Sequence, residues 1–310
     1  MITGASGFVG SVLLRKLVKK NREVHIILRN EASTWRIDDI ISRTKVHRSD
    51  LTNLDDLKKI IIEAKPTIIY HLATNGAYSD QVDADEIIKT NFLGTWNLLQ
   101  ASNLVPYRLF VNTGSSSEYG FKNKAMNEDD ALEPYSYYAV TKSAQSMLCR
   151  FLALSQKKPI VTIRPFSVYG PFEEPRRLVP TLLKSLTDGS EMKLVSAKTA
   201  RDFVYVDDVV EAYLKINKLI KASGEIINIG SGVQTSIGEM VRSACKVTGL
   251  KTVFKLDGME SRSWDTNTWV GDVSKARRLL GWRAKTSLET GLSKTWKWLR
   301  KNKKFYKHEI

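Results

Sequence analysis

Cysteine and histidine are scarce in this sequence: its 310 residues include two cysteines and four histidines. Cys149 and Cys245 lie far apart in stretches that look helical, so we interpret them as small core residues in the reducing cytoplasm rather than as a disulfide. They and the histidines form no zinc pattern, so we expect no metal site. No apolar run approaches the roughly 20 residues of a membrane span and no signal-like start is found, so we expect no membrane partner.

Acidic residues are also in short supply, since 48 lysines and arginines face 33 aspartates and glutamates, a formal net charge of +15. Much of the excess lies in segments 15–22 and 294–310, which look like the ends or outer faces of helices, where lysine is normally solvated. No recognisable nucleic-acid module accompanies it, so we expect no nucleic-acid partner, while an anionic small ligand stays open. The length suggests one large or two medium domains, and 42% apolar residues are ordinary for a globular chain.

A glycine-rich turn follows the first apolar residues and leads directly into an amphipathic helix, SVLLRKLVKK. Glycines at 4, 7 and 10 allow a tight turn, a close approach of backbone to phosphate, and close packing of helix on strand, and the helix N-terminus then faces a pyrophosphate. Only two residues precede Thr3, so we expect a short first strand or a natural chain that begins earlier. The turn predicts a dinucleotide site built from Gly4, Ser6, Gly7, Phe8, Val9 and Gly10.

The residue after the second predicted strand, 23–28, indicates which cofactor binds. An acidic side chain there would accept a hydrogen bond from the ribose 2′-hydroxyl of NAD, whereas an arginine suits a 2′-phosphate. Arg29 occupies this position, which favours NADP. Glu31 follows two residues later, and a shifted register would keep NAD open.

Apolar strands alternate with helices along the first half of the chain. We predict strands near 2–3, 23–28, 45–51, 67–74, 108–113 and 159–164, with helical segments between them. This alternation is typical of an α/β fold with a doubly wound parallel sheet, the Rossmann arrangement.

Tyr138 and Lys142 are four residues apart in PYSYYAVTKSAQSML, so on a helix they share one face. A phenol has a pKa near 10, and a nearby ammonium or a cationic nicotinamide would favour the phenolate. A tyrosine tuned in this way can move a proton on a sugar hydroxyl or ketone while hydride moves on the adjacent carbon. Alone, the pattern is common in helices and has little weight.

Taken in order, the motifs resemble those of the extended short-chain dehydrogenase/reductases, in the NAD(P)-dependent sugar epimerase/dehydratase family. The resemblance covers nearly the whole length. It implies an enzyme acting at C4 of a nucleotide-diphosphate sugar, and a homodimer formed through the helices at 91–99 and 138–152. It is carried by Thr3-Gly4-x-x-Gly7-x-x-Gly10, Asp50-Leu51, His71-Leu-Ala-Thr74, Asn91-x-x-Gly94-Thr, Gly114-Ser-Ser-Ser-Glu-Tyr-Gly120, Tyr138-x-x-x-Lys142, Arg164-Pro-Phe-Ser-Val-Tyr-Gly-Pro171, Arg201-Asp-Phe-Val-Tyr-Val-Asp-Asp208, Asn228-Ile-Gly230 and Leu280-Gly-Trp282.

The resemblance also implies roles for single residues. Ser115 would hydrogen-bond the C4 oxygen beside Tyr138, and Lys142 would also hold the nicotinamide ribose. For Asn91, a structural role is as well supported as a cofactor contact. The further cofactor residues it implies are Asp50 and Leu51 beside adenine, and Leu72, Ala73, Thr74 and Pro165 along the path to the nicotinamide.

Two arginines of the second half are candidates for the diphosphate, because guanidinium geometry suits phosphate oxygens. Arg201 and Arg262 stand in blocks that clamp the diphosphate in the family, and Arg177 is a weaker candidate. The alternative is that they are surface arginines paired with Asp202 and Asp265. Ser115, Ser116 and Ser167 complete the predicted substrate residues, although Ser167 replaces the asparagine usual in its block.

One departure from the family pattern bears on the reaction. Dehydratases of the family carry acidic residues after the catalytic hydroxyl, where this chain has Ser116 and Ser117, so a 4,6-dehydratase is disfavoured. The motif around Ser115 and Arg29 favours a 4-keto-6-deoxy-sugar reductase, with a 4-epimerase that keeps NAD tightly bound as the alternative. A non-catalytic NAD(P)-sensing protein is a hypothesis of another class, disfavoured because Tyr138 and Lys142 are both present. The nucleotide and the sugar stay open.

The expected domains follow from this reading. Residues 1–165, with a returning segment at about 203–216, would form the NAD(P)-binding Rossmann domain. Residues 166–200 and 225–310 would form a smaller C-terminal substrate-binding domain.

Overall fold

The structure is a computed structural model that describes residues 1–310 except 79, 195, 217–222, 252, 256–265 and 304–310. The chain forms two compact units. Unit 1 comprises Met1–Gly120, Ala131–Pro165 and Ala212–Ile227, and unit 2 comprises Phe121–Asp130, Phe166–Glu211 and Asn228–Ile310. The segment that returns to unit 1 is therefore Ala212–Ile227, where the sequence suggested about 203–216.

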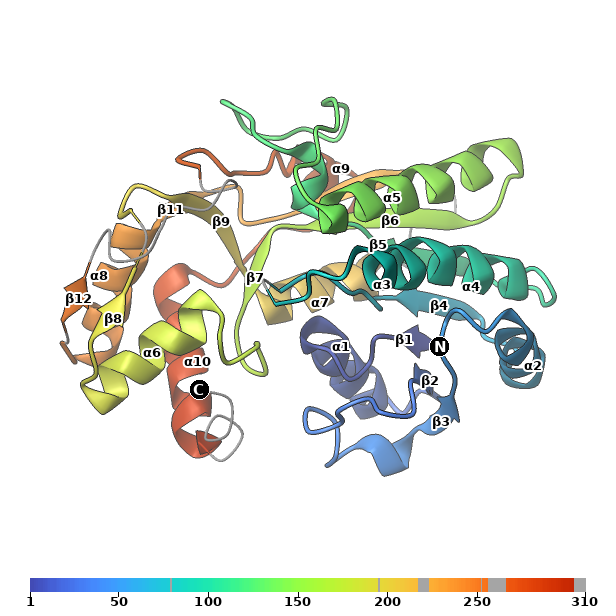
Figure 1. Cartoon of the computed structure of the whole chain (residues 1–310), viewed down its shortest axis with the longest axis horizontal. Coiled ribbons are helices and arrows are strands. Elements are labelled where there is room, and N and C mark those ends of the chain that lie inside the picture. Colours follow the sequence, from blue (N-terminus) through green and yellow to red (C-terminus); the bar gives the residue numbers. More distant parts are fainter. Residues whose placement is uncertain (79, 195, 217–222, 252, 256–265, 304–310) are drawn as a thin grey trace. The chain divides into compact units, whose positions relative to one another are not determined.

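A seven-stranded sheet is the centre of unit 1 (Figure 1). Its neighbouring strands pair in parallel from β6 to β3, and β10 runs beside β6 through hydrogen bonds that advance along both strands together. The doubly wound α/β fold is thus confirmed. In spatial order the strands are β10 (Ile226–Ile229), β6 (Ile160–Pro165), β5 (Leu109–Thr113), β4 (Ile68–His71), β1 (Ile2–Thr3), β2 (His25–Leu28) and β3 (Lys45–Arg48).

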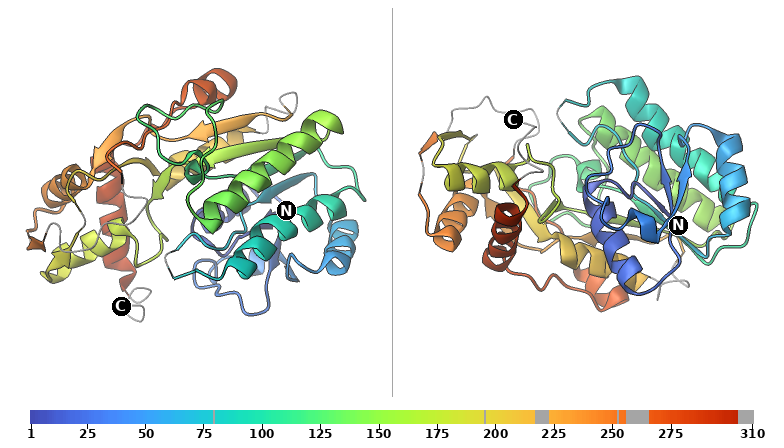
Figure 2. Two further views of the ribbon diagram at one scale, coloured as in Figure 1. Left: turned by 45° about the horizontal axis from the view of Figure 1, so that its top comes forward. Right: turned by 90° about the horizontal axis from the view of Figure 1, so that it is seen from below.

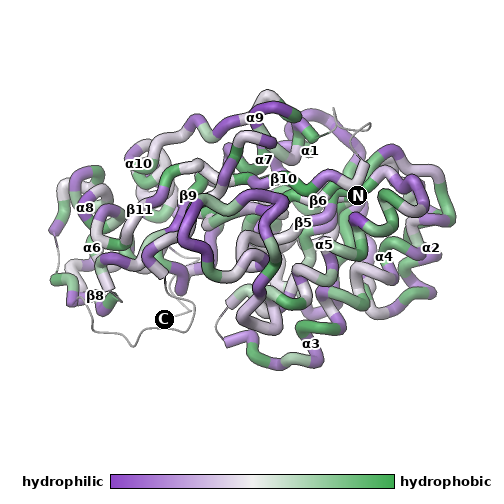
Figure 3. Tube along the Cα trace, turned by 90° about the horizontal axis from the view of Figure 1, so that it is seen from above, coloured by the Kyte–Doolittle hydropathy of each residue, from purple (hydrophilic) through white to green (hydrophobic). Residues whose placement is uncertain are grey.

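Helices cover both faces of this sheet. On one face α2 (Leu54–Ala64), α4 (Gly94–Ser102) and α5 (Tyr137–Ser155) lie side by side (Figure 2). The opposite face carries α1 (Phe8–Lys19) and α7 (Val206–Lys215) (Figure 3). Short elements connect them: the 3₁₀-helices η1 (Ile41–Arg43) and η3 (Ser116–Tyr119), the helix α3 (Ala84–Ile88), and the π-helix η2 (Lys89–Leu93).

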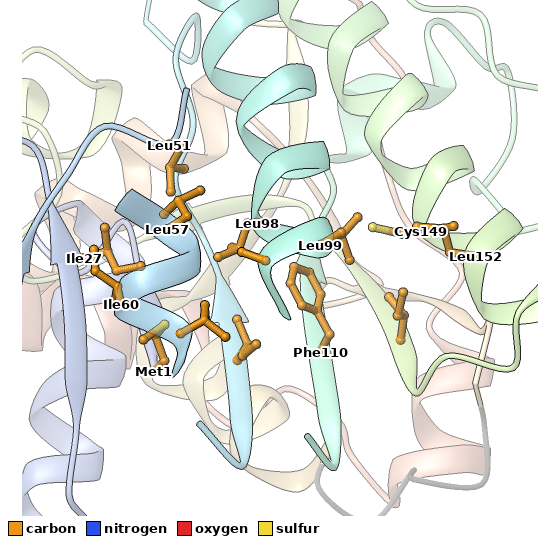
Figure 4. Packing of buried hydrophobic residues seen from close by; sticks show 14 of the residues in the cluster. Met1, Ile27, Leu51, Leu57, Ile60, Leu98, Leu99, Phe110, Cys149 and Leu152 are labelled. Carbon is orange, nitrogen blue, oxygen red and sulfur yellow. The ribbon is translucent and has the colours of Figure 1, made fainter. Parts of the chain in front are cut away.

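Apolar side chains from three helices and the sheet form one core cluster in unit 1 (Figure 4). Leu57 of α2, Leu98 of α4 and Phe110 of β5 are fully buried in it. Cys149 of α5 belongs to the same cluster and is a free cysteine. At roughly 25 cal/mol per Å² of apolar surface, burial of such side chains is the main force that holds the helices on the sheet.

The predicted strands of the first half all appear, most of them one to three residues shorter at one or both ends. The strand that the sequence did not anticipate in this sheet is β10, which adds a seventh strand beside β6. Its sequence, IINI, is buried at every position, as expected for a strand of a parallel sheet covered on both faces.

Unit 2 contains a three-stranded sheet in the order β11 (Gln234–Ser236), β9 (Ala200–Tyr205) and β7 (Ser167–Tyr169), and a two-stranded sheet of β12 (Phe254–Lys255) and β8 (Met192–Lys193). A second apolar cluster lies among α6 (Leu178–Asp188), α8 (Ile237–Thr248) and α10 (Leu288–Lys301), and the same unit contains α9 (Ser274–Leu280). No helix in the described part of the chain is long and apolar enough to cross a membrane.

Candidate functional site

The glycine loop between β1 and α1 is closed too tightly for a side chain at Gly4 and at Gly10. Gly4 has a φ of +72°, and a Cβ there would lie 2.5 Å from the backbone nitrogen of Ala73 at the end of β4. A Cβ at Gly10 would lie 2.1 Å from the carbonyl oxygen of Gly4. Gly7 is the N-cap of α1 and supplies no side-chain cap, and the first turn carries no acidic residue. The helix N-terminus therefore suits a phosphate, as predicted for this loop.

Two arginines stand at the carboxyl ends of neighbouring strands. Arg29 is the exposed residue after β2, and Arg48 ends β3. The Arg48 Nη1 donates to the carbonyl oxygen of Arg29 at 2.8 Å and to that of Asn30 at 3.4 Å. Glu31 is exposed in the turn that follows. The sequence did not single out Arg48; its position at the end of the strand paired with β2 is the signal that would have found it.

Asp50 and Leu51, the residues predicted to lie beside adenine, make contacts within the protein. The Asp50 carboxylate accepts from the backbone nitrogen and the hydroxyl of Thr52, at 2.8 and 2.7 Å. Leu51 is buried in the core cluster and lies against Gly94, where a Cβ would come within 2.9 Å of it.

Asn91 lies fully buried in the π-helix η2, an irregularity that often marks functional regions. Its Oδ1 accepts from the backbone nitrogen of Asn75 (2.7 Å) and the hydroxyl of Thr74 (3.1 Å). Its Nδ2 donates to the carbonyl of Asn75 (2.9 Å) and the hydroxyl of Thr141 (3.0 Å). An asparagine amide has two donor and two acceptor positions, so none remains for a cofactor. This geometry favours the structural alternative for Asn91, which ties the loop after β4 to α5.

Ser115 follows the end of β5 and is the N-cap of η3, with 8% of its surface exposed. Its Oγ accepts from the backbone nitrogen of Ser117 at 3.1 Å. A hydroxyl that accepts one hydrogen bond still has a proton to donate. Ser116, another predicted substrate residue, is also buried.

The helix α5 places Tyr138 in its first turn and Lys142 one turn later. Ser136 caps this helix by accepting from the backbone nitrogen of Ala139. Tyr138 is half-buried, whereas Lys142 is 1% exposed and donates to the carbonyl of Thr113 at 2.8 Å and to Oε1 of Gln145 at 3.1 Å. Burial lowers the pKa of Lys142 to about 8. Because Thr113 stands two residues before Ser115, the ammonium lies at the base of the Ser115 turn.

Two side chains that sequence reasoning did not assign complete this region. Gln145 accepts from Lys142 and donates to Oδ1 of Asn112 at 2.7 Å, which fixes the position of the ammonium. Glu118 is fully buried in an ion pair with Arg164 of β6. For Gln145 the sequence does contain a signal, because residues 142 and 145 are three apart and adjoin on the surface of a helix.

The predicted substrate residues that the structure describes in unit 2 lie on separate elements. Ser167 begins β7, and Arg177 is the exposed N-cap of α6. Arg201 of β9 lies over the ring of Trp269, with Cζ 5.2 Å from its centroid. The neighbouring Asp202 carboxylate, which the alternative interpretation pairs with Arg201, accepts from the backbone nitrogens of residues 231, 232 and 271. Arg262 and its suggested partner Asp265 lie outside the described residues.

A buried histidine connects this end of the sheet to α4. The Nδ1 of His71 lies 2.6 Å from the Thr3 hydroxyl, and its Nε2 lies 2.8 Å from the Thr95 hydroxyl. Thr95 donates its own proton to the carbonyl of Asn91, so it accepts from an Nε2–H, and Nδ1 accepts from Thr3. The ring is therefore neutral, and burial lowers the pKa of His71 to about 3.

We expect this histidine to make stability depend on pH. The unfolded chain binds a proton at His71 below its ordinary pKa of 6.5, whereas the folded chain does not until about pH 3. The free energy of unfolding should fall with decreasing pH across that window by about 1.4 kcal/mol per pH unit. Urea unfolding at pH 7.5 and 5.5 would measure it. Between these two pH values the free energy of unfolding of wild type should fall by about 1.4 kcal/mol more than that of His71→Gln. Equal decreases in the two proteins would contradict this assignment of the His71 pKa.

Comparison with known proteins agrees with the geometry. The family model described as GDP-mannose 4,6 dehydratase matches residues 1–295. A UDP-glucuronate 4-epimerase from Thermodesulfobacterium geofontis is 28% identical over 314 residues, covering 97% of this chain and 96% of the relative.

Solved structures of the same kind superpose closely. The UDP-glucuronic acid 4-epimerase of Bacillus cereus, in complex with UDP-glucuronic acid and NAD, has a TM-score of 0.85 and 29% identity, with 97% of this chain and 98% of that one covered. The UDP-glucose 4-epimerase of Thermotoga maritima, with UDP-glucose, has a TM-score of 0.87 and 26% identity at the same coverages. With the family model spanning nearly all of the sequence, the chain belongs to the GDP-mannose 4,6 dehydratase family of extended short-chain dehydrogenase/reductases, which are NAD(P)-dependent enzymes of nucleotide sugars.

Proposed function

We propose that this enzyme is a nucleotide-sugar 4-epimerase that acts on a UDP-linked sugar, with Tyr138 as its acid–base residue. The observation that carries the proposal is the Ser115 turn next to Lys142, which offers hydroxyls and no free carboxylate. Ser116 and Ser117 occupy the positions where dehydratases of the family carry acids, and Glu118 is held in the ion pair with Arg164. Elimination of water needs an acid and a base at this place, so the chemistry that remains is the interconversion of alcohol and ketone.

The sequence motifs and the similar proteins favour different answers to the choice between epimerase and reductase. Arg29 and the motif around Ser115 favour a reductase at the level of sequence. The similar proteins described above are named 4-epimerases of UDP-glucose and UDP-glucuronate. They give the reductase no support, so the epimerase, first the alternative, becomes the main proposal.

In this mechanism the protein's own groups handle the proton. NAD(P) bound at the glycine loop would supply the acceptor and donor of hydride. Tyr138 removes the proton of the 4-hydroxyl group and later returns one to the 4-keto group after the sugar has presented its other face. Ser115 donates its free hydroxyl proton to the C4 oxygen and holds it beside Tyr138. Lys142 places a positive charge one helical turn away, which favours the phenolate during proton removal.

For the cofactor we propose NADP in place of the NAD that the Bacillus cereus complex contains. Arg29 and Arg48 give the ends of two neighbouring strands positive charge, and the carboxylate that would bind a 2′-hydroxyl is missing from the end of β2. Both guanidinium groups suit a phosphate. An epimerase returns its hydride to the sugar in every turnover, so either cofactor is chemically sufficient.

For the substrate we propose that the diphosphate is bound by the arginines of unit 2, Arg177, Arg201 and Arg262, together with Ser167. Arg201 lies over the ring of Trp269, and the planar guanidinium group suits the oxygens of a diphosphate.

One experiment separates the proposed activity from the reductase. Purified enzyme would be mixed with UDP-glucose, UDP-galactose and UDP-glucuronate without added cofactor, and products would be followed by chromatography. Interconversion of C4 epimers, together with a nucleotide cofactor released on acid denaturation and identified by mass, would support the proposal. Turnover confined to 4-keto sugars with consumption of added NADPH would replace it with the reductase.

We propose that the enzyme is a homodimer formed through α4 and α5. Along α5 the apolar side chains Val140, Met147, Phe151 and Leu154 are 49 to 63% exposed at helical spacing, and Trp96 of α4 is 39% exposed. A strip of this size on one helix is unusual for a surface that faces only water.

Charges placed in that strip should therefore separate the subunits. We expect the double substitution Met147→Glu and Phe151→Glu to convert a dimer into a monomer in light scattering coupled to gel filtration, with the far-ultraviolet circular dichroism unchanged. Ile62→Glu is the matched control, because Ile62 is 51% exposed on α2; it should leave the dimer intact. A monomeric wild type, or a dimer that survives both glutamates, would contradict this interface.

A further inference from the structure

A buried ion pair underlies the turn that carries Ser115. Glu118 and Arg164 have side-chain exposures of 0% and 1%, and Nε of Arg164 lies 2.8 Å from Oε2 of Glu118. The Nη1 of Arg164 has no hydrogen-bond partner among the described residues. Glu118 therefore neutralises the buried positive charge of Arg164. The two groups stay together because neither charge is solvated.

The other carboxylate oxygen of Glu118 holds the turn itself. Oε1 accepts from the backbone nitrogen of Ser115 at 2.7 Å and from the hydroxyl of Ser146 at 3.0 Å. One side chain thus joins three elements: η3, to which it belongs, β6 through Arg164, and α5 through Ser146. Because Ser146 is four residues after Lys142, the same face of α5 supports both the ammonium and the serine turn.

The surroundings fit the pair closely. A Cβ at Gly114 would lie 2.4 Å from Oε1 of Glu118 and 3.1 Å from Cγ of Arg164, so the backbone before Ser115 lies directly on the pair. Arg164 also lies over the ring of Tyr119, with its Cζ 4.7 Å from the ring centroid. The chain around Ser115 therefore has little room to move while the pair is intact.

We propose that Glu118, anchored by Arg164, is a positioning residue that fixes the Ser115 hydroxyl in the orientation needed for proton transfer at the sugar. This rests on the proposed role of Ser115. The backbone nitrogen of Ser115 donates to Glu118, and its Oγ accepts from the backbone nitrogen of Ser117, which leaves the hydroxyl proton of Ser115 to be donated. A carboxylate that the sequence places beside the reacting hydroxyl thus acts on the protein side and never touches substrate.

The test needs a variant that removes the pair without leaving a buried charge. Glu118→Gln alone would strand the Arg164 cation and would lower Tm, whereas replacement of both residues by apolar side chains of similar volume is tolerated far better. We therefore use the double variant Glu118→Met with Arg164→Met. Ser146→Ala is the matched control, because it removes one donor from the same carboxylate and leaves the charge pair and the Ser115 contact in place.

We expect the Met/Met variant to keep the Tm of wild type within a few degrees and to retain its cofactor. Its kcat should fall 10- to 100-fold, with the KM for the nucleotide sugar within about threefold of wild type. Hydrogen exchange of the segment 114–120 should become at least tenfold faster. Ser146→Ala should change kcat, KM and the exchange rate of this segment by less than about threefold each.

A second comparison distinguishes a role in positioning the Ser115 hydroxyl from a general loss of rigidity at the site. In a Ser115→Ala background the Met/Met change should lower kcat by less than about twofold further, since there is no hydroxyl left to position. Multiplied losses in that background, an unchanged kcat in the Met/Met variant, or unchanged exchange of segment 114–120 would each overturn the inference. If wild type converts no nucleotide sugar, the proposed function fails on its own, and the exchange measurement still decides whether the pair holds the turn.

Discussion

Replacement of Tyr138 by phenylalanine is expected to lower kcat about 10³-fold while the enzyme stays folded and keeps its cofactor. The substitution removes one hydroxyl from a half-buried side chain in the first turn of α5. Loss of a positioned acid–base group costs 10² to 10⁴ in rate, and the loss we expect for Tyr138→Phe lies in the middle of that range. Initial rates with a UDP-sugar, measured together with the cofactor content of the protein, give the result.

The chain provides a close control for this change. Tyr137 precedes Tyr138 on the same helix but is 61% exposed, so Tyr137→Phe should keep wild-type rates. Equal activity of the two variants would remove Tyr138 from the mechanism. Loss of the cofactor from Tyr138→Phe would instead make it a binding residue.

Local motifs explain why much of the fold and part of the site follow from the sequence alone. The turn of Gly4 to Gly10 and the pair Tyr138 and Lys142 are each contained within a few residues of one loop or one helix. Their geometry depends on backbone conformation and helical period, which a sequence reveals directly. The alternation of strands and helices then restricts the architecture to a doubly wound sheet.

Contacts between distant segments explain what the sequence did not reveal. The sequence places Glu118 near Ser115, but only the pairing of β5 with β6 brings Arg164 to it and holds its carboxylate in an ion pair. In the same way Arg48 reaches the end of β2 because β3 pairs with that strand. The strand β10 joins the sheet through hydrogen bonds with β6, about sixty residues earlier in the chain. Neither periodicity nor spacing carries such information.

The π-helix η2 shows a third limit. Lys89–Leu93 reads as ordinary helix, and the extra residue in its turn is selected by tertiary contacts, with the Asn91 side chain bonded to residues 74, 75 and 141. An insertion of this kind is stabilised by the partners it reaches and has no signature of its own in the sequence.

The second large effect is expected at Gly10. An alanine Cβ there would lie 2.1 Å from the carbonyl oxygen of Gly4 and 2.9 Å from its carbonyl carbon, and both belong to the backbone of the turn. A contact that close cannot be relieved by a side-chain rotation, so β1 and α1 must move apart and the amide groups that would face the pyrophosphate lose their spacing. We expect the Gly10→Ala variant to bind NAD(P) at least about 100-fold more weakly, which corresponds to about 2.8 kcal/mol.

Gly7→Ala separates this effect from the loss of any glycine in the loop. Its Cβ would lie 3.2 Å from the same carbonyl oxygen, and its φ of −75° suits any residue, so a shift of a few tenths of an ångström accommodates it. Fluorescence titration with NAD and NADP should therefore give Gly7→Ala an affinity within about tenfold of wild type, at the same free energy of unfolding. Gly10→Ala should also unfold about 1 to 3 kcal/mol more easily, the usual cost of overpacking a tight site. Wild-type affinity in Gly10→Ala would mean that the turn opens without cost and that the cofactor does not depend on its closure.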